Sequence, residues 1–188
     1  MSKSSVNAST SQSAVTKKLV FSAVGIALAM VTSYIKVWEM PMGGSVTLLS
    51  MLFISLIGYW YGPKYGLLTG VAYGVLQFIV DPYMLSLPQV VLDYPLAFGA
   101  LGLSGFFSDR KYGLQTGYIA GVLGRFVCSL LSGVIFFASY APDGMNPWAY
   151  SALYQGSYLG AEAVITLVII SLPPVTKALK HVKMQGSM

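Results

Sequence analysis

Long apolar segments recur along most of this sequence, and they constrain the fold more than any other feature. A helix needs about 20 predominantly apolar residues to cross the hydrocarbon core of a bilayer. Only 9% of the 188 residues are charged and 55% are hydrophobic, whereas soluble domains carry about 25% charged residues. Because so few charges cannot cover a water-facing surface, we predict an all-α membrane protein.

Six segments are predicted to span the membrane, and the second and third are short and joined by the turn Gly62-Pro63-Lys64. Residues 1–16, rich in Ser, Thr, Asn and Gln, are predicted to form a disordered tail. Residues 17–183 are predicted to form one six-helix membrane domain. The six segments are Leu19–Val37, Val46–Tyr61, Tyr65–Val80, Leu87–Phe107, Tyr112–Tyr140 and Ala149–Leu172.

Basic residues provide an independent test of this arrangement. With six spans, one side of the membrane receives Lys3, Lys17, Lys18, Lys64, Arg110, Lys111, Lys177, Lys180 and Lys183. The other side receives Lys36 together with the acidic residues Glu39, Asp81 and Asp143. Cytoplasmic loops carry an excess of Lys and Arg, so both termini are predicted to be cytoplasmic.

Three charged residues, Asp93, Arg125 and Glu162, fall inside predicted spans. Each costs about 2.5–3.5 kcal/mol at a helix centre on insertion scales, so such residues are paired, hydrated or functional. One interpretation is a buried ion pair between Arg125 and either carboxylate. The other is the wall of a binding pocket, and the two are compatible.

Aromatic residues gather near the predicted outer ends of the spans, including Tyr83, Tyr94, Phe137 and Tyr150. Such residues also form interfacial belts in ordinary membrane proteins. An acid beside aromatic faces in a dry pocket, however, suits a flat cationic ligand through charge pairing and cation–π contact.

Several function classes lack their motifs in this sequence. It has no phosphate-binding loop of the GxxxxGK[ST] type, so ATP hydrolysis is expected in separate subunits. Cys128 and His181 are the sole residues of their types, which argues against a metal site or a nucleophile–base pair. We expect no enzyme activity, no cofactor and no nucleic-acid partner. Glycines spaced by four, at Gly66, Gly70 and Gly74 and at Gly113, Gly117 and Gly121, favour close helix packing.

Four segments resemble the ThiT/YuaJ family, the thiamine-specific substrate-binding (S) components of energy-coupling factor (ECF) transporters. They occur in the family's order along most of the chain. They are Met40–Thr47 (MPMGGSVT), Leu92–Phe98 (LDYPLAF), Ser132–Phe137 (SGVIFF) followed by Tyr140-Ala141-Pro142, and Tyr150-Ser151 near Trp148. The resemblance implies a high-affinity vitamin-binding subunit in a bacterial cell membrane, with an outward-facing pocket.

The resemblance also implies roles for individual residues and for partner proteins. Ala23 and Ala27 match a small-residue pattern that faces the ECF module, which consists of a transmembrane coupling protein and two ATPases. The resemblance further implies that the loop after the first span forms a lid, which consists of Glu39, Met40, Met42, Gly43 and Gly44. The implied ligand-binding positions are Asp93, Tyr94, Tyr83, Arg125, Gly133, Phe137 and Tyr150.

Three positions depart from the family pattern and leave the ligand open. Ser129 stands where the family usually has His, Gln155 stands where it usually has Asn, and Glu162 has no evident counterpart. All three are candidates for setting ligand specificity, toward thiamine or toward another pyrimidine or pyridine compound such as vitamin B6. A stand-alone transporter driven by protons, with Asp93 and Glu162 as proton carriers, is a further alternative.

Overall fold

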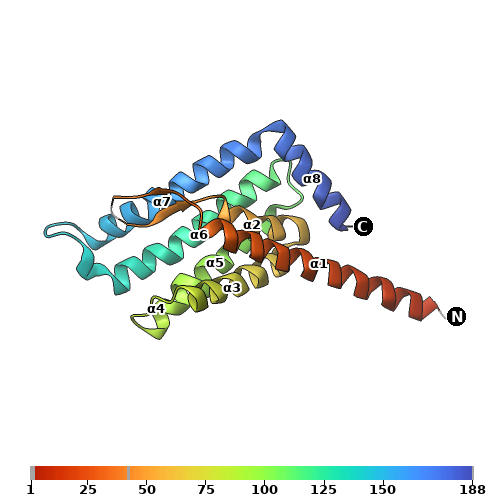
Figure 1. Cartoon of the computed structure of the whole chain (residues 1–188), viewed down its shortest axis with the longest axis horizontal. Coiled ribbons are helices and arrows are strands. Elements are labelled where there is room, and N and C mark those ends of the chain that lie inside the picture. The colour runs from red at the N-terminus through yellow and green to blue at the C-terminus, as the bar shows by residue number, and fades with distance from the viewer. Residues whose placement is uncertain (1–2, 42, 188) are drawn as a thin grey trace.

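The computed structural model describes residues 3–41 and 43–187, and most of them are helical (Figure 1). Between α3 and α6 the chain forms one composite helical segment that changes its winding several times. The long helices are α1 (Lys3–Ser33), α2 (Ser50–Tyr61), α3 (Pro63–Val80), α6 (Gly113–Phe136), α7 (Pro147–Ser171) and α8 (Pro173–Ser187). The composite segment consists of α4 (Leu87–Val91), η1 (Leu92–Leu96), α5 (Ala97–Gly99) and η2 (Ala100–Phe107).

Four helical stretches in the described part of the chain are long and apolar enough to cross a bilayer. They are Gln12–Ser33, Leu87–Phe107, Gly113–Phe136 and Pro147–Ser171. α2 is apolar but has only 12 residues, about 18 Å of helix at 1.5 Å per residue. The hydrocarbon core is about 30 Å thick. The structure therefore gives four candidate spans, and the six-span arrangement stays a prediction.

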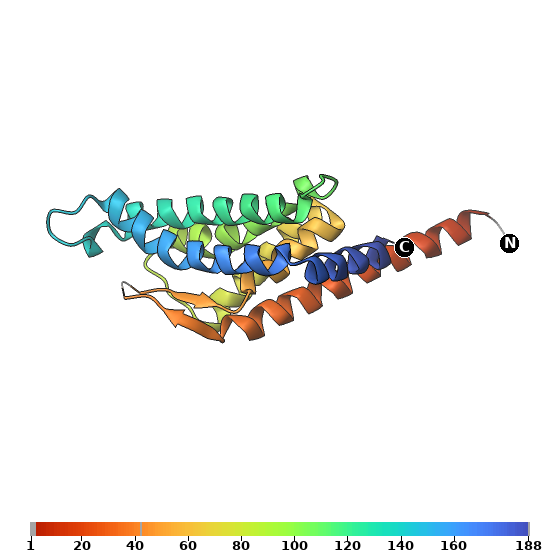
Figure 2. The same ribbon diagram turned by 90° about the horizontal axis from the view of Figure 1, so that it is seen from above.

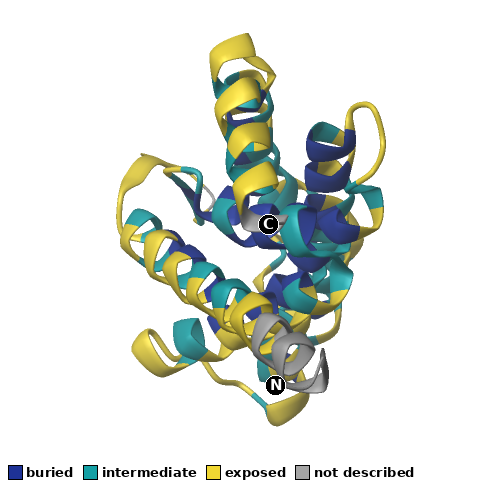
Figure 3. Ribbon diagram, turned by 90° about the vertical axis from the view of Figure 1, so that its right-hand side faces the viewer, coloured by how far each residue is buried: buried dark blue, intermediate teal, exposed yellow. Residues whose placement is uncertain are grey.

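The exterior of the helices is apolar, as a bilayer-facing surface requires. Val31 on α1 is 62% exposed, and Val164 and Val168 on α7 are each 61% exposed. Buried residues instead face the interior of the bundle (Figure 3). Exposed apolar side chains spread over several helices are unusual for a soluble protein and suit contact with lipid.

The ends of several helices differ from the sequence prediction. α1 begins at Lys3, so the segment expected to be a disordered tail continues the first helix. Adding turns to an existing helix avoids the cost of nucleation, which explains how a polar segment extends it. The first predicted span ends early, at Ser33, and the second begins late, at Ser50, because a β-hairpin occupies part of both predicted segments. α6 ends at Phe136 and is followed by the short 3₁₀-helix η3 (Ala138–Tyr140).

This hairpin consists of β1 (Lys36–Glu39) and β2 (Ser45–Thr47), paired antiparallel with Trp38 opposite Val46. It runs beside α7 in the view of Figure 1, and β2 contacts that helix. A two-stranded hairpin is marginally stable alone in water, so its packing against α7 fixes its position.

Glycines bring three segments into backbone contact at the centre of the bundle. A Cβ atom on Gly102 of η2 would overlap the backbone of Gly66 on α3, and one on Gly70 would overlap the Phe98 carbonyl. On the other side, a Cβ on Gly121 of α6 would lie 2.8 Å from the Leu101 carbonyl oxygen. The close packing predicted from the glycine spacing is confirmed.

The composite segment is a π-helix over Leu92–Leu96 and contains Pro95. Proline lacks a backbone N–H and its ring clashes with the carbonyl four residues earlier, so it disrupts regular α-helical bonding. A π-turn changes the direction in which its side chains point, and such turns are frequent at functional sites. Asp93 lies on this turn.

Substitution of Gly102 by Ala tests the close packing. The added methyl group overlaps backbone atoms of α3 that cannot rotate away, so we expect Gly102→Ala to destabilise the protein by about 1–3 kcal/mol. Thermal unfolding in detergent measures the change. Gly160→Ala is the matched control, because a Cβ added at Gly160 would meet nothing within 4 Å. Equal stability of the two variants would contradict the packing argument.

Candidate functional site

A cavity of about 490 Å³ lies where the C-terminal half of α6 meets the N-terminal half of α7. These two helices run side by side in Figure 2, and contacts join them along the bundle. The π-turn η1, the loop after α3 and the residues that follow α6 complete the walls. The lining residues are Tyr83, Asp93, Arg125, Ser129, Gly133, Phe137, Tyr140, Tyr150, Ser151, Tyr154, Gln155 and Tyr158.

Most of the positions predicted to bind ligand therefore come together around one cavity. They are Tyr83, Asp93, Arg125, Ser129, Gly133, Phe137, Tyr150 and Gln155. Four further lining residues, Tyr140, Ser151, Tyr154 and Tyr158, were not among the predicted ligand-binding residues. The spacing of four between Tyr150, Tyr154 and Tyr158 places these side chains on one face of α7, and this spacing is visible in the sequence.

Asp93 is positioned by a neighbour on its own helical segment. Gln89 Nε2 donates a hydrogen bond to Asp93 Oδ2 at 2.7 Å, and Gln89 Oε1 accepts one from the Leu85 backbone N–H at 3.0 Å. Gln89 is only 1% exposed, so its amide has little freedom to rotate. The carboxylate is thus held at the cavity wall with part of its acceptor capacity available.

Arg125 forms no salt bridge with Asp93 or Glu162, so the ion pair considered from the sequence is absent from this structure. A salt bridge joins Lys36 and Glu39 at 3.1 Å. The Arg125 guanidinium instead lies over the Phe98 ring, 4.2 Å from its centroid. Its Nε is buried and has no hydrogen-bond partner in the described part of the protein. A cation stacked on an aromatic face and partly unpaired is available to a polar ligand.

Aromatic rings from the loop after α3 and from the residues that follow α6 line one end of the cavity. Tyr83 and Phe137 stack with centroids 5.8 Å apart and an interplanar angle of 27°. The Tyr83 and Tyr140 hydroxyl oxygens lie 3.4 Å apart, and this interaction, with some desolvation, raises the pKa of the Tyr83 phenol above its ordinary value. At neutral pH the phenol stays protonated and remains a hydrogen-bond donor.

Tyr94 was predicted to bind ligand, but the structure places it outside the lining of the cavity. Its hydroxyl accepts a hydrogen bond from the Tyr83 backbone N–H at 3.0 Å and donates one to the Asp81 carbonyl at 3.1 Å. Its ring packs edge-on against Phe78. The side chain of Tyr94 therefore points toward α3, and its two hydrogen bonds fix the loop that carries Tyr83.

Glu162 also lies outside the main cavity. It is 4% exposed and accepts hydrogen bonds from groups at the junction between β2 and α2. It lines a second cavity of about 240 Å³, whose wall shares Arg125 and Tyr158 with the first. Gln155, seven residues earlier on the same helix, lines the first cavity and not the second, so the two side chains have different surroundings.

The predicted lid residues lie at the tip of the hairpin. Glu39 is exposed and paired with Lys36, and the Gly43 backbone N–H donates to the Met40 carbonyl at 2.9 Å. Gly44 has a φ of +80° and packs against the Tyr158 ring. Met42 lies outside the described residues. The hairpin tip thus contacts tyrosines that also line the cavity.

The two alanines predicted to face a partner protein, Ala23 and Ala27, lie on α1, and both are exposed. Their side chains are accessible from outside the bundle. In the described part of the chain, no group of three His, Cys, Asp or Glu side chains is arranged to hold a metal ion.

These features define a multi-pass membrane protein with a cavity lined by aromatic and polar side chains. Residues 19–182 match the family model described as thiamine transporter protein (Thia_YuaJ), and the chain belongs to this family. It is 32% identical over 148 residues to the thiamine transporter ThiT of Bacillus subtilis, a match that covers 71% of this chain and 77% of that protein. These relatives are named transporters, not enzymes.

Two further similarities agree with this assignment. The thiamine transporter ThiT of Lacticaseibacillus paracasei is 27% identical over 120 residues, which is 55% of this chain and 60% of that protein. The solved structure of ThiT from Listeria monocytogenes has a TM-score of 0.68 and 23% identity, covering 84% of this chain and 94% of that one. The structural match supports the fold.

The role of Tyr94 can be tested by hydrogen exchange. Tyr94→Phe keeps the ring contact with Phe78 but removes the acceptor of the Tyr83 N–H. Because a net hydrogen bond is worth about 1 kcal/mol, we expect the Tyr83 amide to exchange several-fold faster. The Leu85 amide, which donates to Gln89, is the internal control and should be unchanged. Unaltered exchange at Tyr83 would contradict the positioning role.

Proposed function

We propose that this chain is the substrate-binding S component of an ECF-type importer and that it binds thiamine in the cavity between α6 and α7. The observation that carries the proposal is Asp93, a carboxylate without a salt-bridge partner among the described residues, at the wall of an aromatic cavity. Membership of the thiamine transporter family supports the choice of ligand.

The chemistry of thiamine suits this arrangement. Its thiazolium ring is a permanent, flat cation, and cations bind aromatic faces within about 6 Å of the ring centroid. Tyr83 and Phe137 present such faces, and Asp93 supplies the opposite charge. The second ring of thiamine, an aminopyrimidine, carries both hydrogen-bond donors and acceptors. Ser129, Tyr150 and Gln155 line the same cavity and offer matching polar groups.

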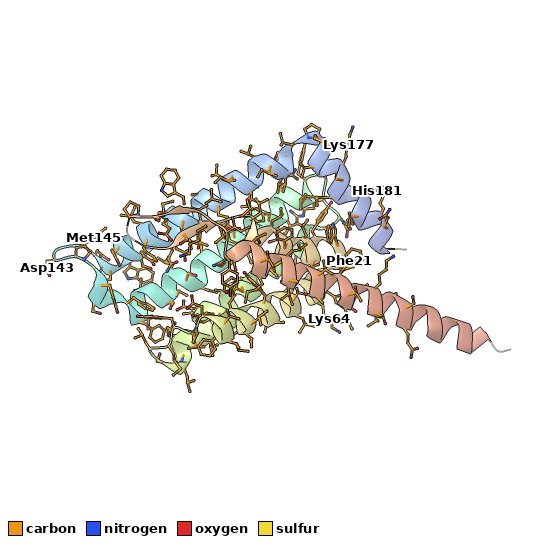
Figure 4. The ribbon with its side chains drawn as sticks, in the orientation of Figure 1. Phe21, Lys64, Asp143, Met145, Lys177 and His181 are labelled. Atoms are coloured by element: carbon orange, nitrogen blue, oxygen red, sulfur yellow. The ribbon has the colours of Figure 1, made fainter. Side chains whose placement is uncertain are left out.

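We further propose six spans, with both termini in the cytoplasm and the cavity open to the outside. Lys64 and Lys177 lie toward the end of the molecule that holds both chain termini, whereas Asp143 lies at the opposite end (Figure 4). The cavity is formed by the halves of α6 and α7 that adjoin the Asp143 loop. The excess of basic residues at the other end supports this orientation.

ATP-driven movement is proposed to come from an ECF module of one transmembrane coupling protein and two ATPases. Ala23 and Ala27 form a small-residue stripe on α1, and small residues let another helix approach closely. The surrounding lipid is the other partner of this surface. The proposed location is a bacterial cell membrane, which agrees with the bacterial origin of the named relatives.

Asp93→Asn tests the site. The change keeps the shape of the side chain but removes the charge, and hydrogen bonds to charged groups are worth about 1.5–3 kcal/mol. We expect thiamine affinity to fall on the order of 10- to 100-fold, as measured by isothermal titration of the purified protein. Asp143→Asn, on the exposed loop after η3, is the control and should bind as the natural protein does.

The same titration identifies the ligand. Ser129 and Gln155 line the cavity at positions where the family usually has other residues, and so the alternative is vitamin B6. Heat on adding thiamine supports the proposal. Binding of pyridoxine without binding of thiamine would overturn the ligand and leave the transporter class in place.

Uptake of labelled thiamine tests the dependence on the ECF module. We expect cells that contain this protein and the complete module to accumulate thiamine, and cells without the ATPases to lose uptake. Persistent uptake would favour the alternative of a stand-alone proton-coupled transporter. The contacts of Glu162 give that alternative no support, because its carboxylate holds a chain junction together.

A further inference from the structure

The Glu162 carboxylate accepts four hydrogen bonds from residues at the junction between β2 and α2. Its Oε2 accepts from the Thr47 backbone N–H at 3.1 Å and from Thr47 Oγ1 at 2.6 Å. Its Oε1 accepts from Ser50 Oγ and from the Met51 backbone N–H, both at 3.2 Å. One side chain of α7 therefore holds both the last residue of β2 and the first turn of α2.

A residue between these two attachment points has an unusual backbone conformation. Leu49 has a φ of 61° and a ψ of 22°, and a non-glycine residue adopts this left-handed conformation only when its surroundings impose it. Leu49 directly precedes α2, where the chain turns from the hairpin into the bundle. Hydrogen bonds on both sides of Leu49 explain how the turn is maintained.

The tip of the same hairpin rests on the same helix. A Cβ at Gly44 would lie 2.5 Å from the Tyr158 ring, and one at Gly43 would lie 3.0 Å from the Tyr154 hydroxyl. Tyr154, Tyr158 and Glu162 are each four residues apart, so they lie in one row along α7. The two tyrosines line the ligand cavity, whereas Glu162 holds the base of the hairpin.

We propose that Glu162 is a positioning residue that clamps the base of the hairpin, so that the tip closes over the cavity from a fixed hinge at Leu49. The hydrogen bonds of Glu162 keep β2 aligned with α7, and Tyr158 and Tyr154 then receive the tip. Loss of the clamp frees the hairpin to swing away and lets the ligand escape. The ligand-binding part of this inference rests on the proposed function.

Limited proteolysis tests the clamp without any ligand. Lys36 is an exposed trypsin site on β1, whereas Arg125 lies within α6 and becomes accessible only when the bundle unfolds. In Glu162→Gln, an NH₂ group replaces one carboxylate oxygen. This group is a donor, so it cannot accept the hydrogen bonds that the oxygen accepted. We expect cleavage after Lys36 to accelerate on the order of tenfold, with cleavage after Arg125 unchanged.

Two further variants provide a control and a replacement for Glu162→Gln. Thr166→Val removes a buried hydroxyl one turn further along the same face of α7 and controls for the loss of any polar group there. Its cleavage after Lys36 should match that of the natural protein. Thr47→Val removes one partner of Glu162 and keeps the carboxylate, so it replaces Glu162→Gln in the test if that variant fails to fold. We expect it, too, to accelerate cleavage after Lys36.

Thiamine dissociation supplies the second measurement. We expect Glu162→Gln to raise the dissociation rate on the order of tenfold and to leave the association rate nearly unchanged. Faster cleavage at both Lys36 and Arg125 would overturn the inference, because it would show general destabilisation. Unchanged cleavage at Lys36 would overturn it as well. If the natural protein does not bind thiamine, the proposed function fails, while the proteolysis result still decides the role of Glu162.

Discussion

The close contact of glycine-rich backbones at the centre of the bundle is the constraint on which the rest of the structure depends. Gly66, Gly70 and Gly102 let α3 lie directly against the composite segment from α4 to η2, and Gly121 lets α6 do the same from the other side. Interlocked in this way, the composite segment cannot rotate freely. The π-turn therefore presents Asp93 to the cavity in one fixed direction.

The sequence predicts much of this architecture because its strongest signals are local. Apolar runs and glycine spacing depend on residues near one another in the chain, and they indicated both the helices and the close packing. Most candidate site residues, including Asp93 and Arg125, also lie around one cavity. The hairpin was missed because its strands have only four and three residues, and because Val37 and Val46 adjoin the apolar runs of the first two predicted spans.

The remaining differences arise from contacts between residues far apart in the sequence. Tyr94 follows Asp93 directly, and consecutive residues of a helix point in different directions. The local sequence does not show which of the two side chains faces the cavity, and the structure shows that it is Asp93. Glu162 was a candidate ligand-binding residue because it is a charge within a span. Its partners lie more than 100 residues earlier in the chain, so only the folded structure shows that it joins α7 to the hairpin. One face of α7 thereby lines the cavity and also contacts the hairpin.

The proposed ligand site can be tested by an experimental structure of the protein purified with thiamine. We expect density for a flat, two-ring molecule in the cavity between α6 and α7, with its cationic ring beside Asp93 and against the Tyr83 and Phe137 rings. Density for thiamine elsewhere would contradict the proposed site, as would an empty cavity in which Asp93 and Arg125 form a salt bridge.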